Sequence, residues 1–279
     1  MVGRTPAGDL FSSLGAIRLT PPSPGSRPYR PPKPLAVRAF DCYFRSQLAR
    51  HFATTRLSSV SEADRWDRSI PTLFIANHTS WWDGLLAFVV GRELGLRVHI
   101  LMDAANLERY GAFRLAGAVP IRRGSPREAH KDLAAARACL RAKTGLWIFP
   151  QGARRPQAER PARLERGAAA LALGHDGPLR VCPVALRYVY LGEQLPEAFA
   201  WLGQPRLVEP GDYASRRQIA PVLERDLLAA IDGLDGLLRT ESVGAFRTIV
   251  AGPLSINKRM DRFRHAVGLL RGPFEARNG

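Results

Sequence analysis

The chain has 279 residues, 46% of them hydrophobic, and its 41 basic and 25 acidic residues give a formal net charge of +16. This length and hydrophobic content exclude a wholly disordered chain and predict one large α/β domain with extensions. The charge predicts an anionic partner, which can be a nucleic acid, an anionic membrane surface or a phosphorylated substrate.

The N-terminal part of the chain divides into two segments. Residues 1–34 are expected to be disordered, because seven prolines fall between positions 21 and 34. In residues 35–60, aromatic residues and leucines recur every three to four positions among arginines, which predicts a basic amphipathic helix. Such a helix can anchor the protein to an anionic membrane surface or pack on the domain, and the pattern fits both.

Residues 61–241 alternate short apolar runs with helical patterns. Strands are expected at 72–76, 97–103, 118–122, 146–149, 180–191 and 199–202. Helices are expected at 83–94, 106–113, 126–143, 163–173 and 218–238. This alternation predicts the α/β class, with a mixed, largely parallel sheet flanked by helices. Residues 242–279 are predicted to be a basic C-terminal extension, partly helical around 258–270.

The segment 77–83 reads N-H-T-S-W-W-D and lies between an expected buried strand and an expected helix. Strand ends are where α/β proteins present reactive groups. Asp83 can fold back onto one imidazole nitrogen of His78 and leave the other nitrogen free to act as a base. No glycine-flanked nucleophilic serine accompanies the pair, so His78 is expected to deprotonate a hydroxyl of the substrate. Taken alone, Asn77 and Asp83 also fit simple capping of the helix.

Two later strand ends carry arginines. The segment 117–123 reads G-A-V-P-I-R-R, and the segment 149–155 reads F-P-Q-G-A-R-R. In each, guanidinium groups and a flexible backbone suit the binding of a phosphate. The alternative is a pair of solvated basic loops, the usual place of surface arginines.

Together these segments resemble the PlsC-type glycerolipid acyltransferases, the family of lysophosphatidate and glycerol-3-phosphate acyltransferases. His78 and Asp83 match the H-x4-D block of that family, and residues 117–123 match its G-x-x-x-x-x-R block. Residues 149–154 match its F-P-E-G-T-R block, and residues 181–184 match its V-P-[VI] block. The order and spacing of the four blocks agree over about half of the chain, which is more specific than any one block.

The resemblance implies transfer of a fatty acyl group from acyl-CoA or acyl carrier protein to a hydroxyl of a lysophospholipid, such as 1-acyl-glycerol-3-phosphate. It implies no metal and no bound cofactor. His78 would be the general base, and Asp83 would orient it. The implied substrate-binding residues are Arg123, Gln151, Gly152 and Arg154. The two arginines would bind the phosphate of the acceptor or that of the donor.

Two positions depart from the pattern of the family. Gln151 stands where the family usually has Glu, and Ala153 stands where it usually has Thr. Gln keeps hydrogen-bonding capacity but loses a negative charge, and Ala loses a hydroxyl. Both changes lie in the acceptor-binding block, so a second interpretation is acyl transfer to a non-phosphate lipid hydroxyl, such as a sugar hydroxyl on a glycosylated membrane terpenoid.

The remaining features concern location and partners. The three cysteines are far apart, so neither a disulfide framework nor a zinc site is expected. No stretch approaches the roughly 20 apolar residues that span a bilayer, and no secretory signal is recognisable. We therefore expect a cytoplasmic protein, peripherally associated with the inner face of the cell membrane through anionic lipids. A non-catalytic basic membrane-binding protein is a further alternative. Nucleic acid is not expected as a partner, because no nucleic-acid-binding pattern appears.

Overall fold

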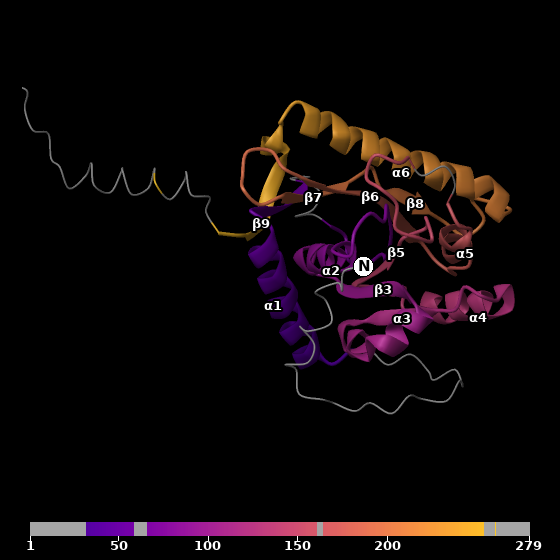
Figure 1. Cartoon of the computed structure of the whole chain (residues 1–279). Helices are drawn as coiled ribbons and strands as arrows, with labels where there is room; N and C mark the ends of the chain where they lie inside the picture. Colours follow the sequence, from indigo (N-terminus) through magenta and orange to yellow (C-terminus); the bar gives the residue numbers. More distant parts are fainter. Residues whose placement is uncertain (1–31, 59–65, 161–163, 254–259, 261–279) are drawn as a thin grey trace, which may run out of the picture.

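The computed structural model of the chain describes residues 32–58, 66–160, 164–253 and 260. They form a nine-stranded sheet with helices on both faces (Figure 1). The predicted α/β class, with a mixed and largely parallel sheet, is therefore confirmed. Most of the segment predicted to be disordered, 1–34, lies outside the described residues. The predicted helix around 258–270 also lies outside them, apart from residue 260.

The elements follow one another in the order that the sequence predicts, with three additional strands. The strands are β1 (Thr54–Ser58), β2 (Thr72–Ala76), β3 (Arg97–Asp103), β4 (Ala118–Ile121), β5 (Thr144–Ile148), β6 (Leu179–Val189), β7 (Glu197–Leu202), β8 (Arg206–Val208) and β9 (Phe246–Ala251). The α-helices are α1 (Pro34–His51), α2 (Asp83–Glu93), α3 (Ala104–Arg109), α4 (Pro126–Arg137), α5 (Gly167–Leu173) and α6 (Arg216–Arg239). Two 3-10 helices are η2 (Gly111–Ala116) and η3 (Val243–Ala245).

The strand order across the sheet is β4-β3-β5-β2-β6-β7-β1-β9, and β8 pairs with β6 outside this path. The first five strands of that order pair in parallel, and β1 pairs in parallel with β7. β7 and β8 pair antiparallel with β6, and β9 pairs antiparallel with β1. The carboxyl ends of β2, β4, β5 and β6 therefore meet at one edge of the sheet, where α/β proteins place reactive groups.

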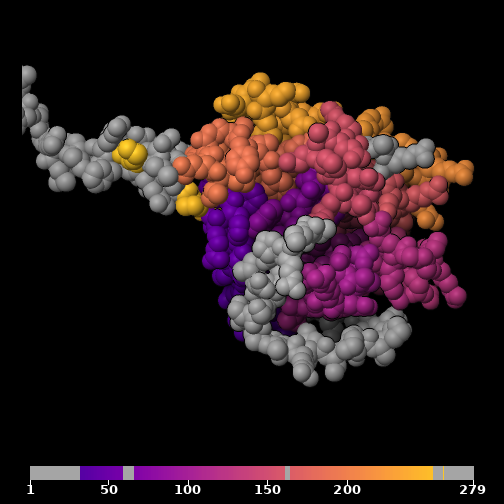
Figure 2. Space-filling view, viewed as in Figure 1, coloured from indigo at the N-terminus to yellow at the C-terminus, as the bar shows by residue number. Residues whose placement is uncertain are grey.

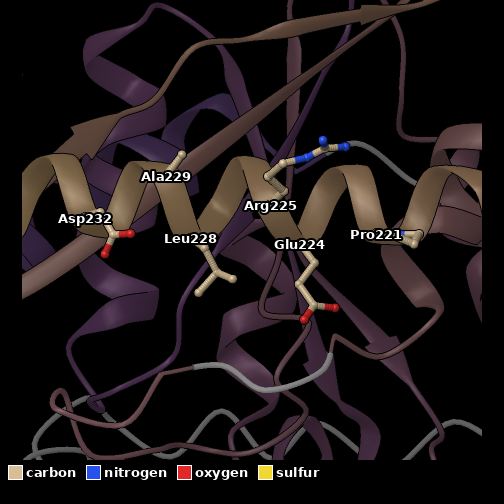
Figure 3. Close-up of a pocket in the computed structure, with 6 residues that line it drawn as sticks. All are labelled: Pro221, Glu224, Arg225, Leu228, Ala229 and Asp232. Atoms are coloured by element: carbon tan, nitrogen blue, oxygen red, sulfur yellow. The ribbon is translucent and has the colours of Figure 1, made fainter.

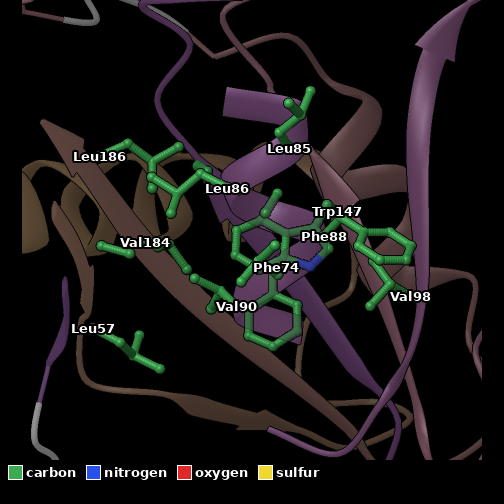
Figure 4. Close-up of a cluster of buried hydrophobic side chains, with 14 of the residues drawn as sticks. Leu57, Phe74, Leu85, Leu86, Phe88, Val90, Val98, Trp147, Val184 and Leu186 are labelled. Carbon is green, nitrogen blue, oxygen red and sulfur yellow. The ribbon is translucent and has the colours of Figure 1, made fainter. Parts of the chain in front are cut away.

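The two faces of the sheet bury separate apolar cores. Successive residues of a strand point to opposite faces, so Phe74 of β2 joins the core beneath α1 and α2, whereas Leu73 and Ile75 join the core beneath α4, α5 and α6. Figure 4 shows the first core, in which Phe74 stacks on Trp147 with 4.4 Å between the ring centroids. α2 is apolar on nearly every side and is buried between the sheet and α1, as expected for such a helix.

The predicted helix at 35–60 is shorter than expected, because α1 ends at His51 and β1 follows it. Thr54 and Thr55 are β-branched and favour an extended chain, and β1 pairs with both β7 and β9. The aromatic face of α1 packs on the domain: Phe44 and Leu48 are buried in the first core. Those side chains are therefore not available to a membrane. In the space-filling view, α1 forms one flank of the molecule and α6 its upper margin (Figure 2).

The predicted C-terminal extension at 242–279 begins with part of the domain itself. Residues 246–251 form β9, which pairs along the whole of β1 and places Phe246 against Phe199 at 5.1 Å between ring centroids. The sheet therefore continues beyond the boundary predicted at residue 241. Within the described ranges, no helix combines the length and the apolar character needed to cross a bilayer.

Candidate active site

His78 and Asp83 form a hydrogen-bonded pair at the carboxyl end of β2. The imidazole Nδ1 lies 2.7 Å from Asp83 Oδ2, which is the contact that the five-residue spacing predicts. Because a carboxylate accepts, Nδ1 carries the proton, and Nε2 is left as the basic nitrogen. The His78 side chain is 27% exposed, whereas that of Asp83 is fully buried. The basic nitrogen, Nε2, thus belongs to a partly exposed imidazole that is held by the buried carboxylate of Asp83.

Asp83 is held by four hydrogen bonds. Its Oδ2 atom also accepts from the backbone N–H groups of Thr79 at 2.6 Å and Ser80 at 2.8 Å, so the chain from 78 to 83 folds around the carboxylate. Its Oδ1 atom accepts from the hydroxyl of Tyr188 at 2.6 Å. A buried carboxylate needs such donors, since burial without them is costly. The donors keep Asp83 in one orientation toward His78.

Tyr188 is a member of this site that the sequence analysis did not identify. It lies near the carboxyl end of β6, the strand beside β2, and its ring contacts Phe52 at 5.5 Å between centroids. Burial raises the pKa of the Tyr188 phenol well above its ordinary value, and the nearby Asp83 carboxylate adds to this effect. The phenol therefore stays protonated and donates to Asp83. No local motif marks a tyrosine 105 residues from its partner.

Two amide side chains fix the loop that carries His78. Asn77 is buried and exchanges two hydrogen bonds with the backbone of Leu186, at 2.7 and 3.1 Å, which ties the end of β2 to β6. Gln151 accepts from the backbone N–H of His78 at 2.5 Å through its side-chain oxygen. A glutamate could accept the same hydrogen bond, so the substitution at 151 keeps this contact and removes a charge. Gln151 thus lies in the loop after β5 and contacts the backbone of His78, whereas the sequence indicated only a substrate-binding role for it.

Arg123 and Gly152 meet at the same edge of the sheet, and we call them, together with Glu165, the arginine corner. The Arg123 guanidinium donates to the backbone oxygen of Gly152 and, at 2.5 Å, to Glu165 Oε1. Gly152 has a φ of 72°, and a Cβ atom there would meet both partner side chains. A residue other than glycine is therefore disfavoured for two reasons. Sequence reasoning placed the arginine and the glycine here but did not identify Glu165.

The neighbouring arginines differ in how firmly they are held. Arg122 is bound by Asp132, at 2.5 and 2.9 Å, and by Glu128 at 2.5 Å, so it fixes the start of α4 against the end of β4. This pairing raises the pKa of Arg122. Arg154 is exposed, and among the described residues no hydrogen bond or ion pair holds its side chain. Arg122 is committed to the fold, whereas Arg154 can receive an anion.

Aromatic rings border the reactive histidine. Phe149 at the end of β5 lies 4.7 Å from His78 between ring centroids. Trp82 packs between Phe52 and His51 at the end of α1, at 5.2 and 4.8 Å. The adjacent Trp81 is 41% exposed. Trp82 is thus packed against the end of α1, whereas Trp81 gives the loop an exposed apolar side chain.

Two surface hollows lie away from the His78–Asp83 pair. Figure 3 shows one on α6, with a volume of about 420 Å³ and lined by Pro221, Glu224, Arg225, Leu228, Ala229 and Asp232. A second, of about 400 Å³, lies between α4, α5 and the start of α6. Neither lining includes a residue of the His78–Asp83 pair. In the part of the chain that the structure describes, no cluster of three or more His, Cys, Asp or Glu side chains is arranged to hold a metal ion.

A comparison with known families supports acyl transfer. A family model described as Acyltransferase matches residues 58–187, slightly less than half of the chain. The matched region contains His78, Asp83, Arg123 and Arg154, and it supports an acyltransferase enzyme. No curated protein matches the chain. The finer assignment to the PlsC-type subfamily stays a prediction.

Proposed function

We propose that this acyltransferase domain moves a fatty acyl group from acyl-CoA or acyl carrier protein to a hydroxyl of a lysophospholipid, such as 1-acyl-glycerol-3-phosphate. The observation that carries the proposal is the His78–Asp83 pair, in which a buried carboxylate holds a partly exposed imidazole. The arginine corner and Arg154 belong to loops at the same sheet edge, which suits an acceptor carrying both a hydroxyl and a phosphate.

His78 Nε2 takes the proton of the acceptor hydroxyl while the oxygen attacks the thioester carbonyl. The tetrahedral intermediate collapses, the C–S bond breaks, and the thiolate recovers the proton from the imidazolium. Asp83 keeps its negative charge throughout and stabilises the imidazolium that forms between the two steps. The four hydrogen bonds that Asp83 accepts hold it against His78, which supports this orienting role.

The phosphate of the acceptor is assigned to Arg123 and Arg154. Arg154 is exposed, and Arg123 lies beside the flexible backbone of Gly152, which can come close to a phosphate oxygen. Gln151 adds no negative charge between these arginines and His78, so the site is more electropositive than one with glutamate. Such a site suits an anionic headgroup.

One observation favours a second acceptor class. Arg123 is already paired with the Glu165 carboxylate, so a phosphate has to compete for it. A non-phosphate lipid hydroxyl, such as a sugar hydroxyl on a glycosylated membrane terpenoid, does not need a free Arg123. Such an acceptor also fits the absence of a glutamate at position 151.

Peripheral association with an anionic membrane is part of the proposal. The net charge of +16 favours such a surface. Two exposed apolar side chains support it: Leu35 at the start of α1 is 80% exposed, and Trp81 stands next to the reactive loop. Both substrates of the reaction carry acyl chains, so a site that meets the bilayer shortens their path.

The deciding experiment is the release of free thiol from palmitoyl-CoA by purified protein. The acceptors compared are lysophosphatidate, glycerol 3-phosphate and a crude membrane-lipid extract, and acyl carrier protein thioester is the second donor. Each is repeated with His78→Ala and with His130→Ala, a matched control because His130 is exposed and lies on α4.

Release that depends on lysophosphatidate, survives His130→Ala and falls by about 10²–10⁴-fold in His78→Ala supports the proposal. Release only with the lipid extract supports the second acceptor class. Activity that is unaffected by His78→Ala contradicts a histidine base. No release with either donor, together with vesicle binding that survives His78→Ala, supports the non-catalytic membrane-binding protein instead.

A further inference from the structure

We propose that Tyr188 is a positioning residue of the acyl-transfer reaction, which acts on His78 through Asp83. This inference rests on the proposed function, because it needs His78 to be the general base. Tyr188 lies one residue beyond the segment matched by the acyltransferase family model. Its role is therefore argued from the geometry of the site.

The two oxygens of Asp83 have separate partners. Oδ2 accepts from His78 and from two backbone N–H groups of the same loop. Oδ1 accepts from the Tyr188 hydroxyl at 2.6 Å, and among the described residues it has no other hydrogen-bond donor. Tyr188 therefore fixes the second oxygen of the carboxylate, while His78 and its loop fix the first. By occupying Oδ1 it directs Oδ2 to the imidazole.

Tyr188 is itself held from several sides. The side-chain amide of Gln157 donates to the backbone oxygen of Tyr188 at 3.0 Å and accepts from its N–H at 2.8 Å. Tyr188 also pairs with Ala198 in the β6–β7 ladder. The ring contacts Phe52, the first residue after α1. A tyrosine whose backbone and ring are both held is preorganised, so its hydroxyl orients Asp83 without losing freedom when substrate binds.

The chemistry allows only one direction of proton donation. The carboxylate is an acceptor, and the phenol stays protonated because burial and the Asp83 charge raise its pKa. Tyr188 is thus a fixed donor and never the base. Its hydrogen bond draws charge density from Asp83, which weakens the attraction between Asp83 and the imidazolium. Without it, Oδ1 of the buried carboxylate would lose its hydrogen-bond donor, and Asp83 would attract the imidazolium more strongly.

The surroundings contain few other groups that titrate. Among the described contacts, Tyr188 is the one titratable side chain outside the pair that touches Asp83. From α1, His51 contacts Trp82 beside Asp83, and from the loop after β5, Arg155 reaches His78 through its backbone N–H. A change in the pH profile caused by a substitution at 188 therefore reports on the His78–Asp83 pair.

The experiment compares Tyr188→Phe with Tyr190→Phe in the full chain. Tyr190 follows the same strand and is 73% exposed, so it is a matched control. We expect Tyr188→Phe to lower kcat by about 10- to 100-fold, the usual effect of one hydrogen bond to a charged group. KM should stay unchanged, and the acid limb of the pH–rate profile should move to higher pH. Tyr190→Phe should match the native protein in all three.

A double-mutant cycle separates positioning from packing. If Tyr188 acts through Asp83, Tyr188→Phe should cause little further loss in an Asp83→Asn background. Equal losses in both backgrounds, or an unchanged kcat and pH profile in the single variant, would overturn the inference. Melting temperatures are recorded for each variant, and any destabilised variant is assayed below its unfolding transition. If His78→Ala keeps full activity, the proposed function fails as well, so the two failures are distinguishable.

Discussion

The His78–Asp83–Tyr188 cluster and the arginine corner lie at the same edge of the sheet but are built differently. In the first, a fully buried carboxylate accepts four hydrogen bonds, three from the loop at 78–80 and one from Tyr188 on β6. In the second, Arg123 and Glu165 are each about half exposed, with side-chain exposures of 41% and 50%. The first cluster is preorganised, whereas the second is solvated and can exchange its partners.

Under the proposed function, the buried cluster determines the type of reaction, and the exposed arginine corner determines the choice of acceptor. A buried and fully hydrogen-bonded pair tolerates few substitutions, since any loss leaves an unsatisfied polar group. An exposed ion pair contributes little to stability and is easily replaced. Of the two departures from the pattern of the PlsC-type enzymes, Ala153 lies in the loop of the arginine corner, and Gln151 lies in the same loop but keeps its hydrogen bond to the His78 backbone. The reaction is therefore predicted more firmly by this sequence than the acceptor.

The largest expected effect is at Asp83. Asp83→Asn keeps the shape of the side chain but removes the charge that stabilises the imidazolium, and it favours the wrong tautomer of His78. We expect kcat to fall by about 10⁴-fold. Asp176→Asn, at an exposed position, is the control. A loss of kcat below about tenfold would mean that the His78–Asp83–Tyr188 cluster is structural. It would also remove the contrast between that cluster and the arginine corner.

The next effect concerns stability and has to be separated from the pH dependence of activity. Burial lowers the pKa of His99 to about 4 from its ordinary 6.5, while a hydrogen bond to Gly117 opposes the shift. The folded state thus binds fewer protons than the unfolded state between these pH values. The free energy of unfolding should therefore fall by about 3 kcal/mol as the pH drops from above 6.5 to below 4.

Urea unfolding of native protein, His99→Gln and His130→Gln checks this effect. His99→Gln should flatten the pH dependence of the free energy of unfolding, and His130→Gln, at an exposed site, should preserve it. If His99→Gln leaves the acid dependence intact, another group is responsible. In that case acid inactivation could not be assigned to the His78–Asp83 pair without a direct measurement of folding at each pH.

A smaller effect is expected at Gly152. Gly152→Ala places a side chain on a residue with a φ of 72° and against both Arg123 and Glu165. The backbone conformation alone costs roughly 1–2 kcal/mol. We expect kcat/KM for lysophosphatidate to fall by about tenfold, with a lower melting temperature. Gly124→Ala is the control, because a Cβ there meets no atom within 4 Å and Gly124 has no positive φ. Equal behaviour of the two variants would argue against a close fit at the arginine corner.

The smallest effect is expected at Glu165. Glu165→Gln removes the charge that competes for Arg123, and exposed pairs of this kind are worth about 0–1 kcal/mol. KM for lysophosphatidate should fall a few-fold at low salt and less at high salt. Glu159→Gln, which lies 3.8 Å from Arg155, is the control. A rise in KM would show that Glu165 positions Arg123 for the phosphate rather than competing with it.

The sequence predicted the parts of the fold that depend on local patterns. The limits of β2 and β3 agree with the predicted 72–76 and 97–103, because their apolar runs are bounded by turn residues. β1, β8 and β9 were not predicted. They are short or half polar, and their extended form depends on pairing with β6, β7 or each other. The end of α1 was missed for the same reason.

The candidate site was predictable where its contacts are close in sequence. His78 and Asp83 are five residues apart, and the geometry of one turn brings them together. Tyr188 could not be found this way, because only the pairing of β6 with β2 brings it to Asp83. The resemblance singled out Arg123 and gave Arg122 no role, and only the structure shows that acidic side chains of α4 hold Arg122.

The position of β1 between β7 and β9 has a consequence for synthesis on the ribosome. β1 is among the first strands to be made, and its two partners begin at Glu197 and Phe246. The N-terminal strand must therefore wait until nearly the whole chain has emerged. Until then α1, with its aromatic face and its arginines, precedes a strand that has no partner. β1 thus emerges long before β7 and β9, whereas the aromatic face of α1 can pack on α2 as soon as α2 has formed.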